Sequence, residues 1–261
     1  MIFLLNHQCL GAGLVPLAGL EAGHMNVVSD RPLDAFDNPA KTACRRDNLR
    51  VLREAAFSLW EDDGRTRLRS DWCELMGATG GLTLDLLESE GILTPGGFVG
   101  IDLDTARIEG YRQRRPDLKW VAGNLYTSLE AMELVNVGVL NLDAYQAVGS
   151  TDAMADFRLV RGLALRSLER FGEFALFLNA DLDAVVRQGL RPGPSLRHHA
   201  ALVSRTFEGC LQRRRLTPEM LLPPGSEDEI DSGFVGTLGA FEIYRGTDRG
   251  HRMANLRVIL R

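Results

Sequence analysis

The chain has 261 residues, which is enough for one large α/β domain with a short appendage. A hydrophobic fraction of 45% suits a globular core, and a charged fraction of 25% argues against a disordered chain. The net charge of −5 excludes a protein that is basic overall and binds nucleic acid through its whole surface.

Residues 1–24 form an apolar stretch ahead of a second methionine, Met25. The stretch lacks a basic start and is too short to span a membrane. We expect it to be a leader or a vector-derived segment outside the functional domain. Nothing else in the sequence approaches a transmembrane segment.

The next region, residues 25–71, is expected to form an N-terminal helical cap. Its main element is a helix over 47–60, whose apolar face carries Leu49, Leu52, Ala56, Leu59 and Trp60. A charged loop is expected over 61–71. Three basic residues precede the helix and could meet an anionic acceptor, although a solvated helix start is favoured: Lys41, Arg45 and Arg46.

Buried strands and amphipathic helices alternate from residue 72 to the end. Strands are expected at 72–76, 97–104, 118–126, 135–145 and 173–183. Helices are expected at 82–91, 105–116, 152–172 and 196–214. A proline- and acid-rich stretch, 223–232, is expected to be a surface loop, and 232–261 to be two strands joined by a glycine-bearing turn.

This alternation predicts an α/β protein. Strands separated by helices form βαβ units and a mostly parallel sheet, whereas two strands joined by a short turn are antiparallel. We therefore expect a three-layer Rossmann-like sandwich with a mostly parallel seven-stranded sheet and an antiparallel C-terminal hairpin.

The first strand-to-helix turn is rich in glycine and reads Gly77-Ala78-Thr79-Gly80-Gly81. Small residues let a ligand approach the backbone, and the free N–H groups of the following helix face that ligand. The next strand ends in Asp102, twenty-one residues after Gly81. A carboxylate at this place accepts hydrogen bonds from the hydroxyls of a ribose. A purely structural turn followed by a strand-end aspartate is the alternative.

Two ligand classes fit such a turn: an NAD-type dinucleotide and S-adenosylmethionine. The sequence lacks the Tyr-x-x-x-Lys pair of short-chain dehydrogenases, because Asp37 and Arg115 stand four residues before the two lysines, Lys41 and Lys119. The third glycine of their motif is also replaced, by Thr83. A nucleotide-dependent oxidoreductase is therefore the less favoured alternative.

Residues 72–183 resemble the class I S-adenosylmethionine-dependent methyltransferases. In that family an acid-ended strand precedes the glycine turn, the second strand ends in the ribose-binding acid, and later strand ends contact the adenine and the methyl donor. The resemblance implies S-adenosyl-L-methionine as cofactor, bound by Glu74, Gly77, Ala78, Gly80, Gly81, Asp102, Asn124 and Asn141. It also implies that the terminal hairpin supplies the sixth and seventh strands, the last inserted antiparallel into the sheet.

The chain departs from the family pattern in the glycine turn. Aligned on Glu74, the pattern acid-x-Gly-x-Gly-x-Gly meets Met76, Ala78 and Gly80. Gly77 can compensate, together with Gly81, by shifting the points of close approach. Asn124 replaces the usual aspartate, and its side-chain carbonyl can still accept from the adenine amino group.

The resemblance places Asp143 and Tyr145 beside the methyl donor as catalytic candidates. Asp143 could act as a base or position the acceptor, or it could be a helix cap or loop carboxylate. Tyr145 could stack on the methionine part or on an acceptor ring, or simply pack. The stretch resembles the Asn/Asp-Pro-Pro-Tyr of enzymes that methylate amino groups of nucleic acids, but both prolines are absent.

No metal site is expected. The four cysteines, at positions 9, 44, 73 and 210, form no C-x-x-C pair, and Cys73 falls in a predicted buried strand as a small hydrophobic residue. His198 and His199 are adjacent on a helix and so point in different directions. We expect a cytoplasmic protein with no membrane partner, whose acceptor is a small molecule or a nucleic acid; a homo-oligomer is compatible with the sequence. A non-catalytic binding or assembly module of the same fold is the main alternative.

Overall fold

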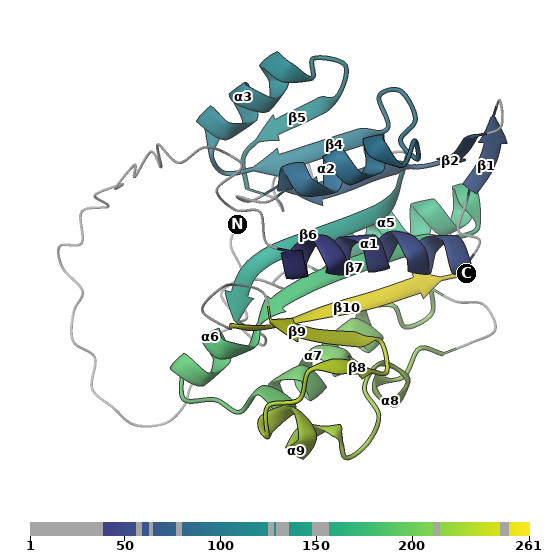
Figure 1. Cartoon of the computed structure of the whole chain (residues 1–261). Helices are drawn as coiled ribbons and strands as arrows, with labels where there is room; N and C mark the ends of the chain where they lie inside the picture. Colours follow the sequence, from purple (N-terminus) through teal and green to yellow (C-terminus); the bar gives the residue numbers. More distant parts are fainter. Residues whose placement is uncertain are drawn as a thin grey trace, which may run out of the picture. The chain divides into compact units, whose positions relative to one another are not determined.

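A computed structural model gives the structure of the chain (Figure 1). It describes residues 39–55, 59–62, 65–76, 80–124, 128, 136–147, 157–210, 215–245 and 251–261. Only the backbone is described for 59–62, 65–66, 80, 143–147 and 157–158. The segment expected at 1–24 lies outside the described residues.

The main sheet of the described chain has eight strands, in the order β5-β4-β3-β6-β7-β10-β9-β8. Their bounds are β3 (Asp71–Leu75), β4 (Phe98–Asp102), β5 (Lys119–Ala122), β6 (Val137–Ala147), β7 (Phe174–Asp181), β8 (Gly236–Leu238), β9 (Phe241–Arg245) and β10 (Arg252–Leu260). The predicted count of seven is wrong because three residues, Gly236–Leu238, pair with β9 and add a short strand at the edge of the sheet.

The strand directions confirm a mostly parallel α/β sheet with an antiparallel C-terminal hairpin. From β5 to β7 all neighbours are parallel. The last strand, β10, lies between β7 and β9 and is antiparallel to both. The chain passes from β3 outward to β4 and β5, then returns to the other side of β3 as β6. Strand order therefore reverses between β3 and β6.

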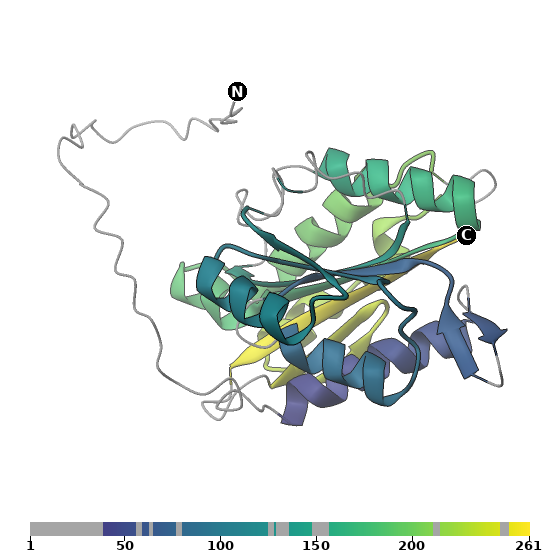
Figure 2. The same ribbon diagram turned by 90° about the horizontal axis from the view of Figure 1, so that it is seen from above.

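Helices cover both faces of this sheet (Figure 2). The helices whose bounds are described are α1 (Pro39–Glu54), α2 (Gly80–Ser89), α3 (Thr105–Arg114), α5 (Phe157–Phe171), α6 (Leu182–Arg187), α7 (Pro192–Thr206), α8 (Pro218–Leu221) and α9 (Ser226–Asp231). Alternate residues of a strand face opposite sides. Trp72 of β3 and Met76, which follows the strand, join the core under α1, α2 and α3, whereas Cys73 of β3 packs in the core that includes α5 and α7. The expected burial of Cys73 is confirmed.

The region before β3 differs from the sequence prediction. The helix begins at Pro39 and ends at Glu54, so Leu59 and Trp60 do not lie on a helical face. They belong to β1 (Leu59–Asp62), which pairs antiparallel with β2 (Arg65–Leu68). The expected charged loop is therefore partly a hairpin. Two residues of the sequence separate these strands, Asp63-Gly64, a strong hairpin signal that the helical periodicity obscured. Residues 33–261 form one compact unit.

Two of the basic residues of α1 are buried, contrary to expectation. Lys41 is 2% exposed and Arg45 is 4% exposed, whereas Arg46 is exposed as expected for a solvated position. The helix lies along the face of the sheet, and its contacts reach from β3 to β10. The expectation of a solvated helix start is therefore wrong for Lys41 and Arg45.

The region expected as a loop at 223–232 contains the short helix α9, which packs on α7. Gly193, in the first turn of α7, donates its backbone N–H to Asp231 over 2.8 Å. A Cβ atom added at Gly193 would overlap the backbone carbonyl of Glu227. Only a residue without a side chain allows the two helices to approach so closely.

We expect Gly193→Ala to lower the free energy of unfolding by about 2 kcal/mol, because the carbonyl of α9 must move to admit a methyl group. Urea unfolding measures the change. Gly162→Ala in α5 is the matched control, since nothing lies within 4 Å of its added Cβ, and it should be neutral or slightly stabilising. Equal stability of the two variants would contradict this account of the helix contact.

Candidate functional site

Three of the predicted site residues, Glu74, Asp102 and Asn141, lie on neighbouring parallel strands of the sheet. In sheets of this kind, ligands bind beyond the carboxyl ends of the strands at the point where strand order reverses. Here that point lies between β3 and β6. Glu74 of β3 and Asn141 of β6 are direct partners in register across it. Asp102 ends β4, and its partner on β5 is Ala122.

Glu74 is fully buried and accepts hydrogen bonds from several directions. Asn141 Nδ2 donates to its two carboxylate oxygens over 2.8 and 3.0 Å. Trp72 Nε1 donates over 2.8 Å, and the Thr83 hydroxyl over 2.9 Å. Arg45 Nη2 lies 3.9 Å from Glu74 Oε1 and forms a buried ion pair with it. The structure thus places Glu74 inside the core, between β3, α1 and α2.

Asn141 is 1% exposed and is oriented by Glu74. A carboxylate can only accept, so the amide nitrogen of Asn141 must face it and the amide oxygen must point away. That oxygen, Oδ1, is buried, and no partner for it occurs among the described residues. A buried acceptor of this kind is a candidate contact for a ligand that carries N–H groups.

Asp102 is held by its own neighbours. Its Oδ1 accepts the backbone N–H of Asp104 over 2.9 Å, and its Oδ2 accepts from Arg107 Nη1 over 2.6 Å. Arg107 also lies 3.3 Å from Asp104 Oδ2. Asp104 caps α3 by accepting from the backbone N–H of Arg107. Each oxygen of Asp102 keeps a lone pair that could still meet a hydroxyl group.

Gly81 makes room for a side chain of the protein itself. A Cβ atom there would lie 2.7 Å from the hydroxyl of Tyr111, which belongs to α3. The Tyr111 ring stacks on Trp120 with centroids 4.9 Å apart. Burial raises the pKa of the Tyr111 hydroxyl above its ordinary value and so keeps it protonated. Close approach at Gly81 therefore serves the packing of α3 on α2.

The other predicted residues are described only in part. Gly77 and Ala78 lie outside the described residues, and Gly80 begins α2. Asn124 follows β5 and is exposed. For Asp143 and Tyr145 the backbone alone is described. Both lie within β6, which continues to Ala147, and Asp143 pairs in register with Asn179 of β7.

An exposed apolar side chain that was not among the predicted site residues lies beside Asp102. Leu103 directly follows Asp102 and is 72% exposed. Its signal in the sequence is a leucine between two aspartates just after a buried strand. A large exposed apolar residue beside a candidate ligand carboxylate is informative, because it could pack against a planar ring.

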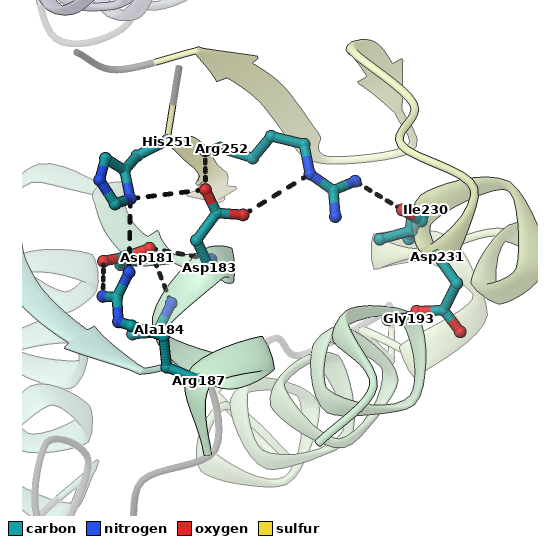
Figure 3. Close-up of polar contacts among 9 residues, drawn as sticks. All are labelled: Asp181, Asp183, Ala184, Arg187, Gly193, Ile230, Asp231, His251 and Arg252. Atoms are coloured by element: carbon teal, nitrogen blue, oxygen red, sulfur yellow. Dashed lines mark hydrogen bonds and ion pairs between the residues drawn. The ribbon is translucent and has the colours of Figure 1, made fainter. Parts of the chain in front are cut away.

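A second charged group lies at the carboxyl end of β7 and the start of β10 (Figure 3). Asp181 accepts from Arg187 Nη2 over 2.9 Å, and Asp183 accepts the backbone N–H of Arg252 over 3.0 Å. His251 Nδ1 lies 3.5 Å from Asp183 Oδ2 and 3.4 Å from Arg187 Nη1. These contacts fasten α6 to the beginning of β10. The strand-end pair of aspartates was visible in the sequence, but its partners come from distant segments.

Neither histidines nor cysteines gather into a metal site in the part of the chain that is described. No group of three His, Cys, Asp or Glu residues there could hold an ion. His198 is exposed and His199 is buried, which confirms that the adjacent rings point apart.

No protein-family model matches the sequence, and a search of curated proteins found no significant match. Among the described helices, none combines the length and apolar character needed to cross a membrane. The fold and the geometry of the sheet edge are therefore the guide to function.

Proposed function

We propose that the chain is an S-adenosylmethionine-dependent methyltransferase whose donor site lies at the carboxyl edge of β3, β4 and β6. The observation that carries the proposal is the place of β10, which lies antiparallel between β7 and β9. The resemblance to the class I enzymes implies this position for the last strand. The reversal of strand order between β3 and β6 supports a ligand site at the same edge.

The described side chains fit the polar groups of the donor. S-adenosylmethionine carries two ribose hydroxyls, an ammonium group and an adenine ring. Asp102 keeps one acceptor position on each oxygen for the hydroxyls. Asn141 Oδ1 lacks a partner among the described residues and could accept from the ammonium group. Leu103 offers an apolar surface to the ring.

Glu74 has a different part in this proposal. Its oxygens already accept from Asn141, Trp72 and Thr83. It would therefore act as a positioning residue, which turns the amide oxygen of Asn141 toward the donor rather than touching the donor itself.

Methyl transfer needs little bond activation from the protein, because the methyl group on a sulfonium sulfur is already reactive. The protein has to align the acceptor for in-line attack and take up a proton where the acceptor carries one. Asp143 and Tyr145 remain the proposed residues for this task, on the strand next to β3. The acceptor would be a small molecule or a nucleic acid.

A non-catalytic binding module is the second candidate, and one observation favours it. Arg107 is hydrogen-bonded to the carboxylate proposed to hold the ribose. A donor would have to share Asp102 with Arg107 or displace it, which weakens binding. Binding of S-adenosylhomocysteine without methyl transfer to small molecules, RNA or DNA would favour this second candidate.

We expect Asp102→Asn to weaken binding of S-adenosylhomocysteine about 10- to 100-fold, since hydrogen bonds to a charged group contribute about 1.5–3 kcal/mol. Titration calorimetry measures the affinity. Asp104→Asn is the matched control: it also removes a carboxylate beside Arg107, but asparagine keeps the helix cap, so affinity should change little.

The wild-type titrations decide between the classes. Failure of both S-adenosylmethionine and S-adenosylhomocysteine to bind would refute the proposed function, and binding of NAD instead would support an oxidoreductase. Full-strength binding by Asp102→Asn would refute the ribose assignment alone.

A further inference from the structure

The contact between α1 and the sheet is unusually polar. Six residues of α1 are buried, and half of them are polar: Lys41, Cys44, Arg45, Asn48, Leu49 and Leu52. A helix that covers a sheet normally buries an apolar stripe. Here the polar residues follow one another at helical spacing of four and three positions, so they share the face that meets the sheet.

Polar side chains of β10 and α2 contact this face of α1. Asn48 Oδ1 accepts from Asn255 Nδ2 over 2.7 Å and from Arg257 Nε over 2.9 Å, both on β10. Arg45 Nε donates to the Thr83 hydroxyl of α2 over 2.7 Å. These hydrogen bonds join α1 to both β10 and α2. Water could replace them if α1 moved away, because the same side chains can bond to water instead.

Two amide oxygens between α1 and the sheet have no hydrogen-bond partner among the described residues. They are Asn141 Oδ1 and Asn255 Oδ1, and both are buried under α1. The crevice beside Asn141 is too narrow to admit a water molecule; it is lined by Arg45, Asn48, Leu49, Trp72, Thr83, Leu86 and Asn141. Unpaired buried acceptors oppose the seated position of α1, because lifting the helix would hydrate them.

We propose that α1 is a lid over the reversal point of the sheet, which lifts away as a unit while the rest of the core stays folded. Opening would expose Glu74, Asn141 and Asn255 to water. It would also release Thr83, and with it the first turn of α2 next to the glycine turn. Local opening of a segment held by few apolar contacts is a general property of folded proteins.

One consequence rests on the proposed function. The ammonium group of a donor could reach Asn141 Oδ1 only after α1 has lifted, because that oxygen is buried and the crevice beside it admits no water molecule. The donor would then favour the open lid, because a ligand shifts an equilibrium toward the state that it binds better.

The rates at which two cysteines react with a thiol reagent measure the opening of α1. Cys44 of α1 is 5% exposed and packs against Tyr244 and Met253, and Cys73 of β3 is fully buried in the sheet. Under native conditions we expect a thiol reagent such as iodoacetamide to label Cys44 at least about tenfold faster than Cys73. Labelling of Cys44 should also depend less steeply on urea, because opening α1 exposes less surface than global unfolding. Peptide mass spectrometry resolves the sites.

Two variants test the assignment further. Asn48→Ala removes the acceptor shared by Asn255 and Arg257, so it should speed the labelling of Cys44. Gly193→Ala weakens the fold far from α1, at the α7–α9 contact; it should speed the labelling of Cys73 by a larger factor than the labelling of Cys44. Equal rates for Cys44 and Cys73, with the same urea dependence in the wild type, would overturn the lid.

Saturating S-adenosylhomocysteine separates this proposal from the proposed function. If the ligand binds and speeds the labelling of Cys44, the donor favours the open lid. If it binds and leaves the labelling of Cys44 unchanged or slower, the coupling is refuted. If it does not bind, the proposed function fails, and the lid is judged by the ligand-free rates alone.

Discussion

Glu74→Gln is expected to lower the free energy of unfolding by about 3 kcal/mol, as removal of one partner from a buried ion pair usually does. Glu74 is fully buried opposite Arg45, which is 4% exposed. Glutamine keeps the size of the side chain but loses the charge and places an amide nitrogen among donors. The donors that then compete for one oxygen come from Asn141, Trp72 and Thr83.

Urea unfolding of the two proteins at pH 7 measures this loss. Glu109→Gln is the control, because Glu109 forms an exposed pair with Arg112 on α3; it should change stability by less than about 0.5 kcal/mol. A loss below about 1 kcal/mol for Glu74→Gln would mean that water or a shift of α1 satisfies Arg45. That result would itself favour the lid proposed for α1.

Strands β4 and β7 were predictable because each is a buried, mostly apolar run with a clear end. The segment 98–102 is buried throughout and ends in Asp102, and 174–181 is buried along its whole length and ends in Asp181. Such runs need no knowledge of their partners. The edge strand β8 was missed because Gly236–Leu238 is short and only partly buried, so its sequence carries no periodic signal.

The sequence was enough to predict which residues belong to the candidate site. It was not enough to predict their hydrogen-bond partners. Glu74 and Asn141 were both placed there, yet the hydrogen bond between them joins residues 67 positions apart. The burial of Arg45 depends on Glu74 and Thr83, which also lie far along the chain. An arginine near the start of a helix is predicted to be solvated unless its acceptors are known, because a buried charge needs a partner.

Stability should fall in acid because of one buried histidine. The pKa of His199 is lowered from 6.5 to about 4, mainly by burial and to a smaller extent by the charge of His198. Its ring lies edge-on to Phe241, and no partner for Nδ1 occurs among the described residues. Between pH 7 and pH 4 the unfolded chain binds a proton at this site and the folded chain does not. The free energy of unfolding therefore decreases as the pH falls through this window, by about 3 kcal/mol in total, and this contribution levels off below pH 4.

Replacing the ring with a neutral apolar group should remove this dependence. We expect His199→Leu to flatten the fall in stability between pH 7 and pH 4, and to be more stable than the wild type at pH 4.5, because no proton then distinguishes the two states. Urea unfolding at a series of pH values gives the slope for each variant. His198→Gln is the matched control on the neighbouring, exposed position; since burial is the main cause of the shift, most of the slope should remain. An unchanged slope in His199→Leu would assign the acid sensitivity to other groups, and would mean that His199 already gains a proton inside the folded protein.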